Sequence, residues 1–319
     1  MDFQSCYNNS SFILMEGALG ERLKREYDIP FDEVIALAGH IYNGKSKHAL
    51  KELFHQYIKI SQHYHLPIML TTPTRRANKE RVAQSKYNES IIYDNVSFLS
   101  EIKQDFPSDV YIGGLMGCKG DAYKATGVLS EKEAFEFHSW QSSLFKKAKA
   151  DFLYAGIMPA LSEAIGMASA MENTGLPYII SFMIRNDGKL IDGTTIHDAI
   201  RAIDNVTNRK PLCYMTNCVH PKVVIKALSQ TYNQTALVNT RFKGIKANTS
   251  PLSPEELDNC CDLKTSSPDN LANDMLKLYK DFNLKIFGGC CGTDSTHMNE
   301  IAKRLSAVSM ENRLFMNGR

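Results

Sequence analysis

Short apolar segments recur along this chain, and each is followed by a small or polar residue and then by an amphipathic stretch. The segments show little alternation between apolar and polar residues, which is typical of parallel strands that are buried on both faces. Eight such segments occur, at residues 12–15, 67–70, 110–115, 152–157, 178–184, 211–216, 243–247 and 285–289. This repetition predicts eight βα units in one chain.

The stretches between these predicted strands have the periodicity of helices. Apolar residues recur at helical spacing in 48–64, 130–150, 162–175, 220–230 and 270–282. Ser130 and Glu133 form a capping-box pattern at the start of one of them. The alternation predicts an α/β fold, a single-domain (β/α)8 TIM-type barrel over residues 1–319, with residues 1–10 as a poorly ordered tail. An open doubly wound sheet is the alternative, but no G-x-G-x-x-G motif follows any predicted strand.

The charge balance excludes several classes of partner. The chain has 37 basic and 35 acidic residues, a net charge of +2, which gives no electrostatic footprint for nucleic acid or an anionic membrane. No apolar run reaches the length of a membrane span, and the N-terminus does not resemble a signal peptide. We therefore expect a cytoplasmic protein with reduced cysteines and small-molecule partners. The sequence leaves the oligomeric state open, a homo-oligomer included.

Cysteines follow two of the predicted strands. In a (β/α)8 barrel, the catalytic groups gather at the carboxyl ends of the strands. Cys218 follows the sixth predicted strand, and Cys290 and Cys291 follow the eighth between glycines. Three thiolates without a fourth protein ligand are typical of catalytic zinc, which keeps one position for substrate or water. We therefore expect these three cysteines to bind Zn²⁺; the alternative is that all three are buried as small apolar residues.

The other cysteines have simpler interpretations. Cys213 lies inside a predicted strand and is expected in the core. Cys118, near the end of the third predicted strand, is either a reserve ligand or a nearby thiol without a role in binding. The pair at 260–261 has no neighbouring glycines and is expected in a helix or loop. His220 precedes Pro221 and is expected to cap a helix rather than to bind metal.

The Asn217-Cys218 pair and the segment Gly288–Thr293, Gly-Gly-Cys-Cys-Gly-Thr, resemble the zinc-binding elements of the homocysteine S-methyltransferase family. Weaker similarities follow the family's order at residues 14–23, 70–77, 111–123 and 297–305. The resemblance implies a zinc-dependent barrel enzyme that transfers a methyl group to a thiol, with homocysteine as acceptor and methionine as product.

Two positions depart from the family pattern. Glu16 stands where the family usually has an aspartate, and Gly156 stands where it has a glutamate that helps to hold the substrate's amino group. The resemblance implies that Glu16 binds this amino group. It also implies that the pocket is lined by Thr71, Thr72 and Asn217. No catalytic residue beyond the metal site is expected.

The chemistry expected at such a site is a direct displacement. A free thiol titrates near pH 8.5, and zinc stabilises its thiolate, which is the nucleophile. The thiolate would attack a methyl group on a sulfonium, a quaternary ammonium or a methylated cofactor, and the donor would leave neutral, so no strong general acid is needed. Two alternatives remain open: a zinc enzyme of the same fold with another thiol acceptor, and a non-catalytic zinc-binding barrel.

Overall fold

The computed structural model describes residues 1–107, 109–251 and 266–317, with side chains as far as residue 309. Eight parallel strands form a closed barrel in which each strand pairs with the next and β8 pairs with β1. The strands are β1 (Ile13–Met15), β2 (Ile68–Thr71), β3 (Val110–Gly117), β4 (Phe152–Met158), β5 (Tyr178–Phe182), β6 (Cys213–Val219), β7 (Phe242–Ala247) and β8 (Ile286–Gly289). The predicted barrel is thus confirmed, and the open sheet is excluded.

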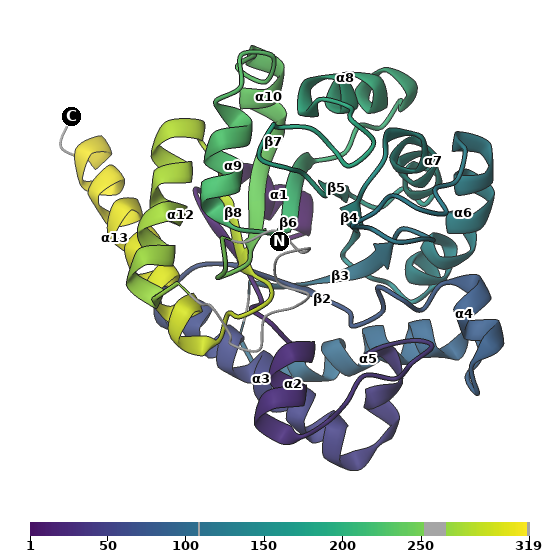
Figure 1. Cartoon of the computed structure of the whole chain (residues 1–319). Helices are drawn as coiled ribbons and strands as arrows, with labels where there is room; N and C mark the ends of the chain where they lie inside the picture. The colour runs from purple at the N-terminus through teal and green to yellow at the C-terminus, as the bar shows by residue number, and fades with distance from the viewer. Residues whose placement is uncertain (108, 252–265, 318–319) are drawn as a thin grey trace.

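Helices surround the strands on the outside of the barrel, except α1 (Phe3–Asn9), which lies at one end of it (Figure 1). They are α1 (Phe3–Asn9), α2 (Gly20–Tyr27), η1 (Ala38–Tyr42), α3 (Gly44–His63), α4 (Lys79–Gln84), α5 (Ser90–Gln104), α6 (Glu131–Lys147), α7 (Leu161–Glu172), α8 (Ile196–Val206), α9 (Pro221–Leu228), α10 (Ala236–Arg241), α12 (Pro268–Phe282) and α13 (Ser295–Asn317). The predicted capping box is present at α6, and His220 caps α9 by accepting from Lys222 N. None of the described helices is long and apolar enough to cross a membrane.

The apolar residues form two layers, one outside and one inside the sheet. The outer layer joins the strands to the helices, as when α3 buries the stripe Leu50, Leu53, Phe54, Tyr57 and Ile58. Each such fully buried side chain stabilises the fold by about 1.5–3 kcal/mol. The inner layer fills the barrel and includes Met15, Met69, Phe152, Ile179, Met215 and Ile286. The barrel is therefore a packed core, and ligands can reach only its ends.

The first helix closes one end of this barrel. Residues 1–10, for which the sequence predicts a poorly ordered tail, instead form α1, capped by Asp2. Phe3 stacks on Phe152 with a centroid distance of 4.2 Å, and Cys6 is buried in the same interior cluster. The expectation of a poorly ordered tail is wrong because Phe3 and Cys6 pack against strands that are distant in the sequence, and no local pattern predicts such contacts.

Candidate metal centre

Three thiols meet at the carboxyl end of the barrel. Cys218 lies near the end of β6, and Cys290 and Cys291 form the turn after β8. Their sulfur atoms all lie within 4.8 Å of one another. In a tetrahedral zinc site with Zn–S bonds near 2.3 Å, sulfurs are separated by about 3.8 Å, so the cluster fits such an ion after a small contraction. Cys218 is buried, Cys290 is half-buried and Cys291 is exposed, which leaves one side open to a ligand.

Cys218 owes its direction to a bulge in β6. The register between β6 and β7 shifts between Asn217 and Val219, and Cys218 has a φ of 60°, in the left-handed region. In a regular strand, side chains alternate between the two faces of the sheet, so Asn217 would point toward the barrel interior and Cys218 outward. The bulge inserts one extra residue and re-aims its side chain. Left-handed backbone costs a non-glycine residue about 1–2 kcal/mol, so neighbouring contacts must hold it in place.

Two asparagines hold this bulge. Asn217 Oδ1 accepts hydrogen bonds from Ser181 Oγ at 2.6 Å and from Ile157 N at 3.0 Å. Ile157 is itself a left-handed residue, in a register irregularity of β4, so Asn217 ties two irregular strands together. Asn248 Nδ2 donates to Cys218 O at 2.9 Å. Asn217, expected to line the pocket, therefore also positions the residue that follows it.

The Gly-Gly-Cys-Cys-Gly-Thr turn is fixed by its own hydrogen bonds. Cys290 N donates to Ala247 O at 2.7 Å, and Thr293 Oγ1 donates to Cys290 O at 2.7 Å. Gly292 has a φ of 82°, and a Cβ there would lie 1.9 Å from Thr249 Oγ1. Only glycine fits this position. The tight turn is what allows two consecutive cysteines to face one point.

The three thiols are electrostatically coupled. Hydrogen bonding from Cys218, then from Cys291, holds the pKa of Cys290 well below its usual range, and the charge of Lys246 adds to the effect. Hydrogen bonding to Cys290 raises the pKa of Cys218 to about 12, and hydrogen bonding to Cys218 raises the pKa of Cys291. Hydrogen bonding within the group thus favours ionisation of Cys290 over that of the other two thiols, and a cation bound by all three sulfurs would displace the thiol protons that remain.

An ion pair that the sequence did not predict lies beside the thiols. Glu16 is fully buried, and its Oε1 lies 2.5 Å from Lys246 Nζ of β7. Thr71 supports the same carboxylate through its hydroxyl, at 2.5 Å, and its backbone N, at 3.1 Å. Lys246 reaches β1 by crossing β8 at Gly288, where a Cβ would lie 3.3 Å from Lys246 Cγ and 2.5 Å from Met15 Cβ. The absence of a side chain at Gly288 therefore leaves room for Lys246 to reach Glu16.

The remaining predicted residues have separate roles. Thr72 Oγ1 lies 2.7 Å from Thr74 Oγ1 and accepts from Leu115 N at 3.0 Å, so it braces the loop after β2. Cys118 lies outside the three-thiol group, and its Sγ contacts Gly120 O at 3.5 Å. Burial, then Glu163, raises the pKa of Cys118 to about 12. Its distance from the other three thiols is what leaves it out of the group. Cys213 is buried in the core, as expected.

Tyr123 is a residue near the thiols that sequence reasoning missed. It lies on the loop between β3 and α6, and the charges of Cys218, Cys290 and Cys291 all act to raise the pKa of its phenol. Tyr123 is half-buried, and its phenol lies within electrostatic range of the three sulfurs. No motif marks it in the sequence, because its loop folds over the barrel through long-range contacts. The cysteine pair at 260–261 lies outside the described residues.

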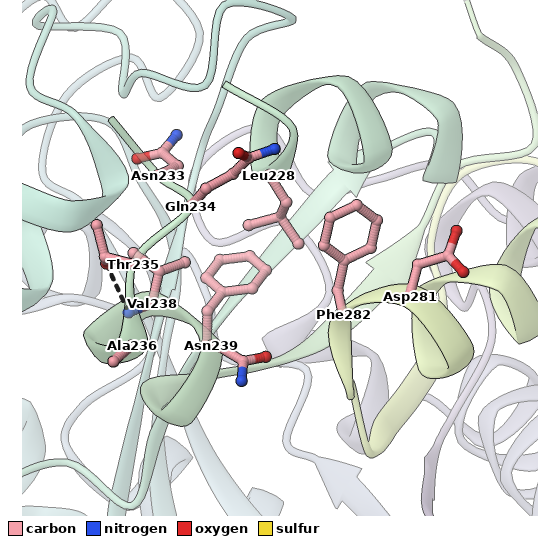
Figure 2. Close-up of a pocket in the computed structure, with 10 residues that line it drawn as sticks. Leu228, Asn233, Gln234, Thr235, Ala236, Val238, Asn239, Asp281 and Phe282 are labelled. Atoms are coloured by element: carbon pink, nitrogen blue, oxygen red, sulfur yellow. Dashed lines mark hydrogen bonds between the residues drawn. The ribbon is translucent and has the colours of Figure 1, made fainter. Parts of the chain in front are cut away.

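A separate pocket of about 410 Å³ lies away from the thiols. Figure 2 shows Leu228 of α9 and Phe282 of α12 on its wall, with Thr235 and Val238 of the α10 region on another side. Phe242, the first residue of β7, also lines it. The pocket thus belongs to the amino end of the barrel, where conserved chemistry is not found in this fold.

The fold and the thiol cluster define the class: a (β/α)8-barrel enzyme with its chemistry at the carboxyl ends of the strands. The family model for homocysteine S-methyltransferase matches residues 13–305, so the chain belongs to this family and is an S-methyltransferase. Among solved structures, it is similar to the homocysteine methyltransferase MmuM from Escherichia coli.

The metallated form of MmuM has a TM-score of 0.75 and 17% sequence identity, and the match covers 94% of this chain and 98% of that one. The apo form has a TM-score of 0.66 and 18% identity, covering 93% and 97%. This likeness supports the barrel fold. The comparison with curated proteins gave no match.

Proposed function

We propose that this protein is a zinc-dependent methyltransferase that moves a methyl group from a sulfonium or quaternary ammonium donor to a thiol, with homocysteine as acceptor and methionine as product. The observation that carries the proposal is the group of three thiols, all within 4.8 Å, at the carboxyl end of the barrel. Cys218, Cys290 and Cys291 would hold the ion. Three protein thiolates leave the fourth zinc position for the acceptor sulfur.

When bound, zinc would stabilise the acceptor sulfur as a thiolate at neutral pH. The new bond forms between this sulfur and the methyl carbon, and the donor departs with the electron pair of its old bond as a neutral sulfide or amine. The thiol proton is lost before this step. The chain therefore needs residues that hold and orient rather than a strong general acid.

The residues around the cluster fit this task. Asn248 Nδ2 donates to Cys218 O at 2.9 Å, and the preceding residue, Asn217, is held by hydrogen bonds from Ser181 Oγ and Ile157 N at 2.6 and 3.0 Å. Tyr123 lies within electrostatic range of the three sulfurs. Thr71 and Thr72 would line the floor of the pocket, as the sequence implies. The sequence also implies that Glu16 binds the acceptor's amino group, and its contact with Lys246 bears directly on that role.

Metal analysis of purified protein tests the proposal. The wild type is expected to contain near-stoichiometric zinc, and Cys290→Ala is expected to lose it because two thiolates bind zinc far more weakly than three. Cys118→Ala is the matched control, since this thiol lies outside the group and its removal should leave the zinc content unchanged. Absence of zinc from the wild type would contradict the proposal.

A second assay tests the reaction itself. Methionine formation from homocysteine is measured with S-methylmethionine, betaine and S-adenosylmethionine in turn. Turnover with one of these donors, lost in Cys290→Ala and kept in Cys118→Ala, is the expected result. A zinc-loaded protein that makes no methionine from any of the three would show that the acceptor or the donor class is wrong.

A further inference from the structure

Glu16 has no exposed surface and already has three contacts within the protein. Its buried carboxylate accepts from Thr71 N at 3.1 Å and Thr71 Oγ1 at 2.5 Å, and it pairs with Lys246 Nζ at 2.5 Å. Because Glu16 is completely buried, a ligand ammonium could reach it only by moving a neighbouring group, and the neighbour Lys246 carries the same charge as the ligand. Displacing a buried partner would also leave the Lys246 cation without its counter-charge, which is costly.

Lys246 remains a cation with donors to spare. Burial acts to lower its pKa, but Glu16 and the Cys290 thiolate outweigh burial, and the pKa is raised. An ammonium has three N–H donors. Within the described ranges, Glu16 is the hydrogen-bond partner of Nζ. The side chain keeps 13% of its surface exposed, so a ligand beside the cysteines can reach it.

Arg75 is a second cation at the same end of the barrel. It follows β2 in a loop that Thr74 fixes by donating from Oγ1 to Leu115 O at 2.8 Å. Its stem packs on the end of β3, because a Cβ at Gly117 would lie 2.8 Å from Arg75 Cγ. Its charge acts on the Cys218 thiol, so the guanidinium lies within electrostatic range of the cluster. Across residues 1–107, 109–251 and 266–317, no hydrogen bond or ion pair engages it.

The nearby carboxylates do not offset these cations. Glu163 is buried, accepts from Lys119 N at 2.7 Å and lies 3.0 Å from His138 Nε2. Asp121 holds its own turn by accepting from Tyr123 N at 2.7 Å. Gly156, the partner of Gly117 in the sheet register, contributes no side chain. Glu163 and Asp121 each already accept a hydrogen bond from a backbone N–H of the β3–α6 loop. The end of the barrel that holds the thiols therefore offers a ligand the two cations Lys246 and Arg75.

We propose that the acceptor thiol is recognised through its own carboxylate, which Arg75 and the remaining N–H donors of Lys246 bind, and that the protein does not recognise an ammonium group on the acceptor. Lys246 thus acts twice: it closes Glu16 to ammonium groups, and it supplies a donor for the opposite charge. This inference rests on the proposed metal-thiolate function and names the class of its acceptor, a carboxylate-bearing thiol.

Thiol binding to the cobalt-substituted protein tests the inference without a methyl donor, because a thiolate that joins Co²⁺ changes its visible absorption. Three acceptors of equal chain length are titrated: homocysteine, γ-mercaptobutyrate, which lacks the ammonium, and homocysteamine, which lacks the carboxylate. We expect γ-mercaptobutyrate to bind within about threefold of homocysteine. Homocysteamine should bind at least about tenfold more weakly, as expected for loss of a charged hydrogen bond.

Two variants assign the effect to residues. Arg75→Gln should weaken γ-mercaptobutyrate at least about tenfold and leave homocysteamine within about twofold. Arg76→Gln, the exposed neighbour, is the matched control and should change neither. Because a lone Lys246 variant leaves Glu16 buried and unpaired, the double variant Glu16→Gln/Lys246→Gln removes the pair together. It should weaken γ-mercaptobutyrate and not homocysteamine.

The outcomes separate this inference from the proposed function. A protein that takes up no cobalt would overturn the metal-thiolate function and this inference with it. If cobalt binds and the three acceptor thiols bind with equal affinity, the protein does not recognise the acceptor's carboxylate, and only this inference fails. Tighter binding of homocysteamine than of γ-mercaptobutyrate would overturn it in favour of ammonium recognition.

Discussion

Asn217 offers the sharpest test of how the barrel positions its thiols. Its Oδ1 is the acceptor for two buried donors, Ser181 Oγ and Ile157 N. Asn217→Ala leaves both donors without this acceptor. A buried unpaired donor costs about 1–3 kcal/mol, so the loss of the acceptor for two donors should lower the free energy of unfolding by about 2–6 kcal/mol. Cys218 also loses the brace on its left-handed backbone, and zinc affinity should fall by about 10–100-fold, as for other residues that orient metal ligands.

Two measurements separate stability from metal binding. Urea unfolding in the presence of a chelator gives the loss of folding free energy, and competition with a chromophoric chelator gives the zinc affinity. Ser181→Ala is the matched control, because Asn217 Oδ1 still accepts from Ile157 N after this change. It should cost about 1 kcal/mol and leave zinc affinity within about threefold. Equal effects of the two variants on zinc affinity would refute the bracing role of Asn217.

Two further predictions concern the turn after β8 and the cap of α9. Gly292→Ala should destabilise the protein by more than about 2 kcal/mol through its positive φ and the contact with Thr249, whereas Gly44→Ala, in open space, should be neutral or stabilising in urea unfolding. Burial, then Lys222, lowers the pKa of His220 to about 4, while the unfolded imidazole titrates near 6.5. Above about pH 6.5 the His220 imidazole is neutral in both the folded and the unfolded protein. Below this pH the unfolded protein binds the proton first, so the free energy of unfolding should fall by about 1.4 kcal/mol per pH unit down to about pH 4. His220→Asn keeps the cap and should flatten this slope between pH 7 and pH 5 in chelator-treated protein; an unchanged slope would contradict the assignment.

The features that the sequence predicted correctly depend on patterns among residues that are close together in the chain. All eight strands appear within a few residues of the apolar runs, because a strand buried on both faces must be apolar along its length. The three cysteines converge because strand ends of a parallel barrel share one rim. The glycines around Cys290 and Cys291 marked a sharp turn, and Gly292 adopts the positive φ that they implied.

The features that it missed depend on contacts between distant strands. A bulge such as that at Cys218 leaves no mark in a single strand, because it is defined by the register with its neighbour. Lys246 made the seventh predicted strand look less apolar than the others. The structure explains this charge, because closure of the barrel places Glu16 of the segment after β1 within reach of Lys246 across Gly288. Arg75 was one of two consecutive arginines, and the residues around it gave no sign that it faces the site.

The helix that closes the barrel also sets an order of events during synthesis. Phe3 of α1 packs against Tyr111 and Phe152, and Lys285 Nζ donates to Tyr7 O and lies 4.5 Å from the Tyr7 ring centroid. These partners are spread over the chain, and the last of them immediately precedes β8. Residues 3–7 are made before these partners, so they cannot complete their contacts until the chain as far as β8 has been made. Docking of α1 is thus a late step that reports closure of the barrel.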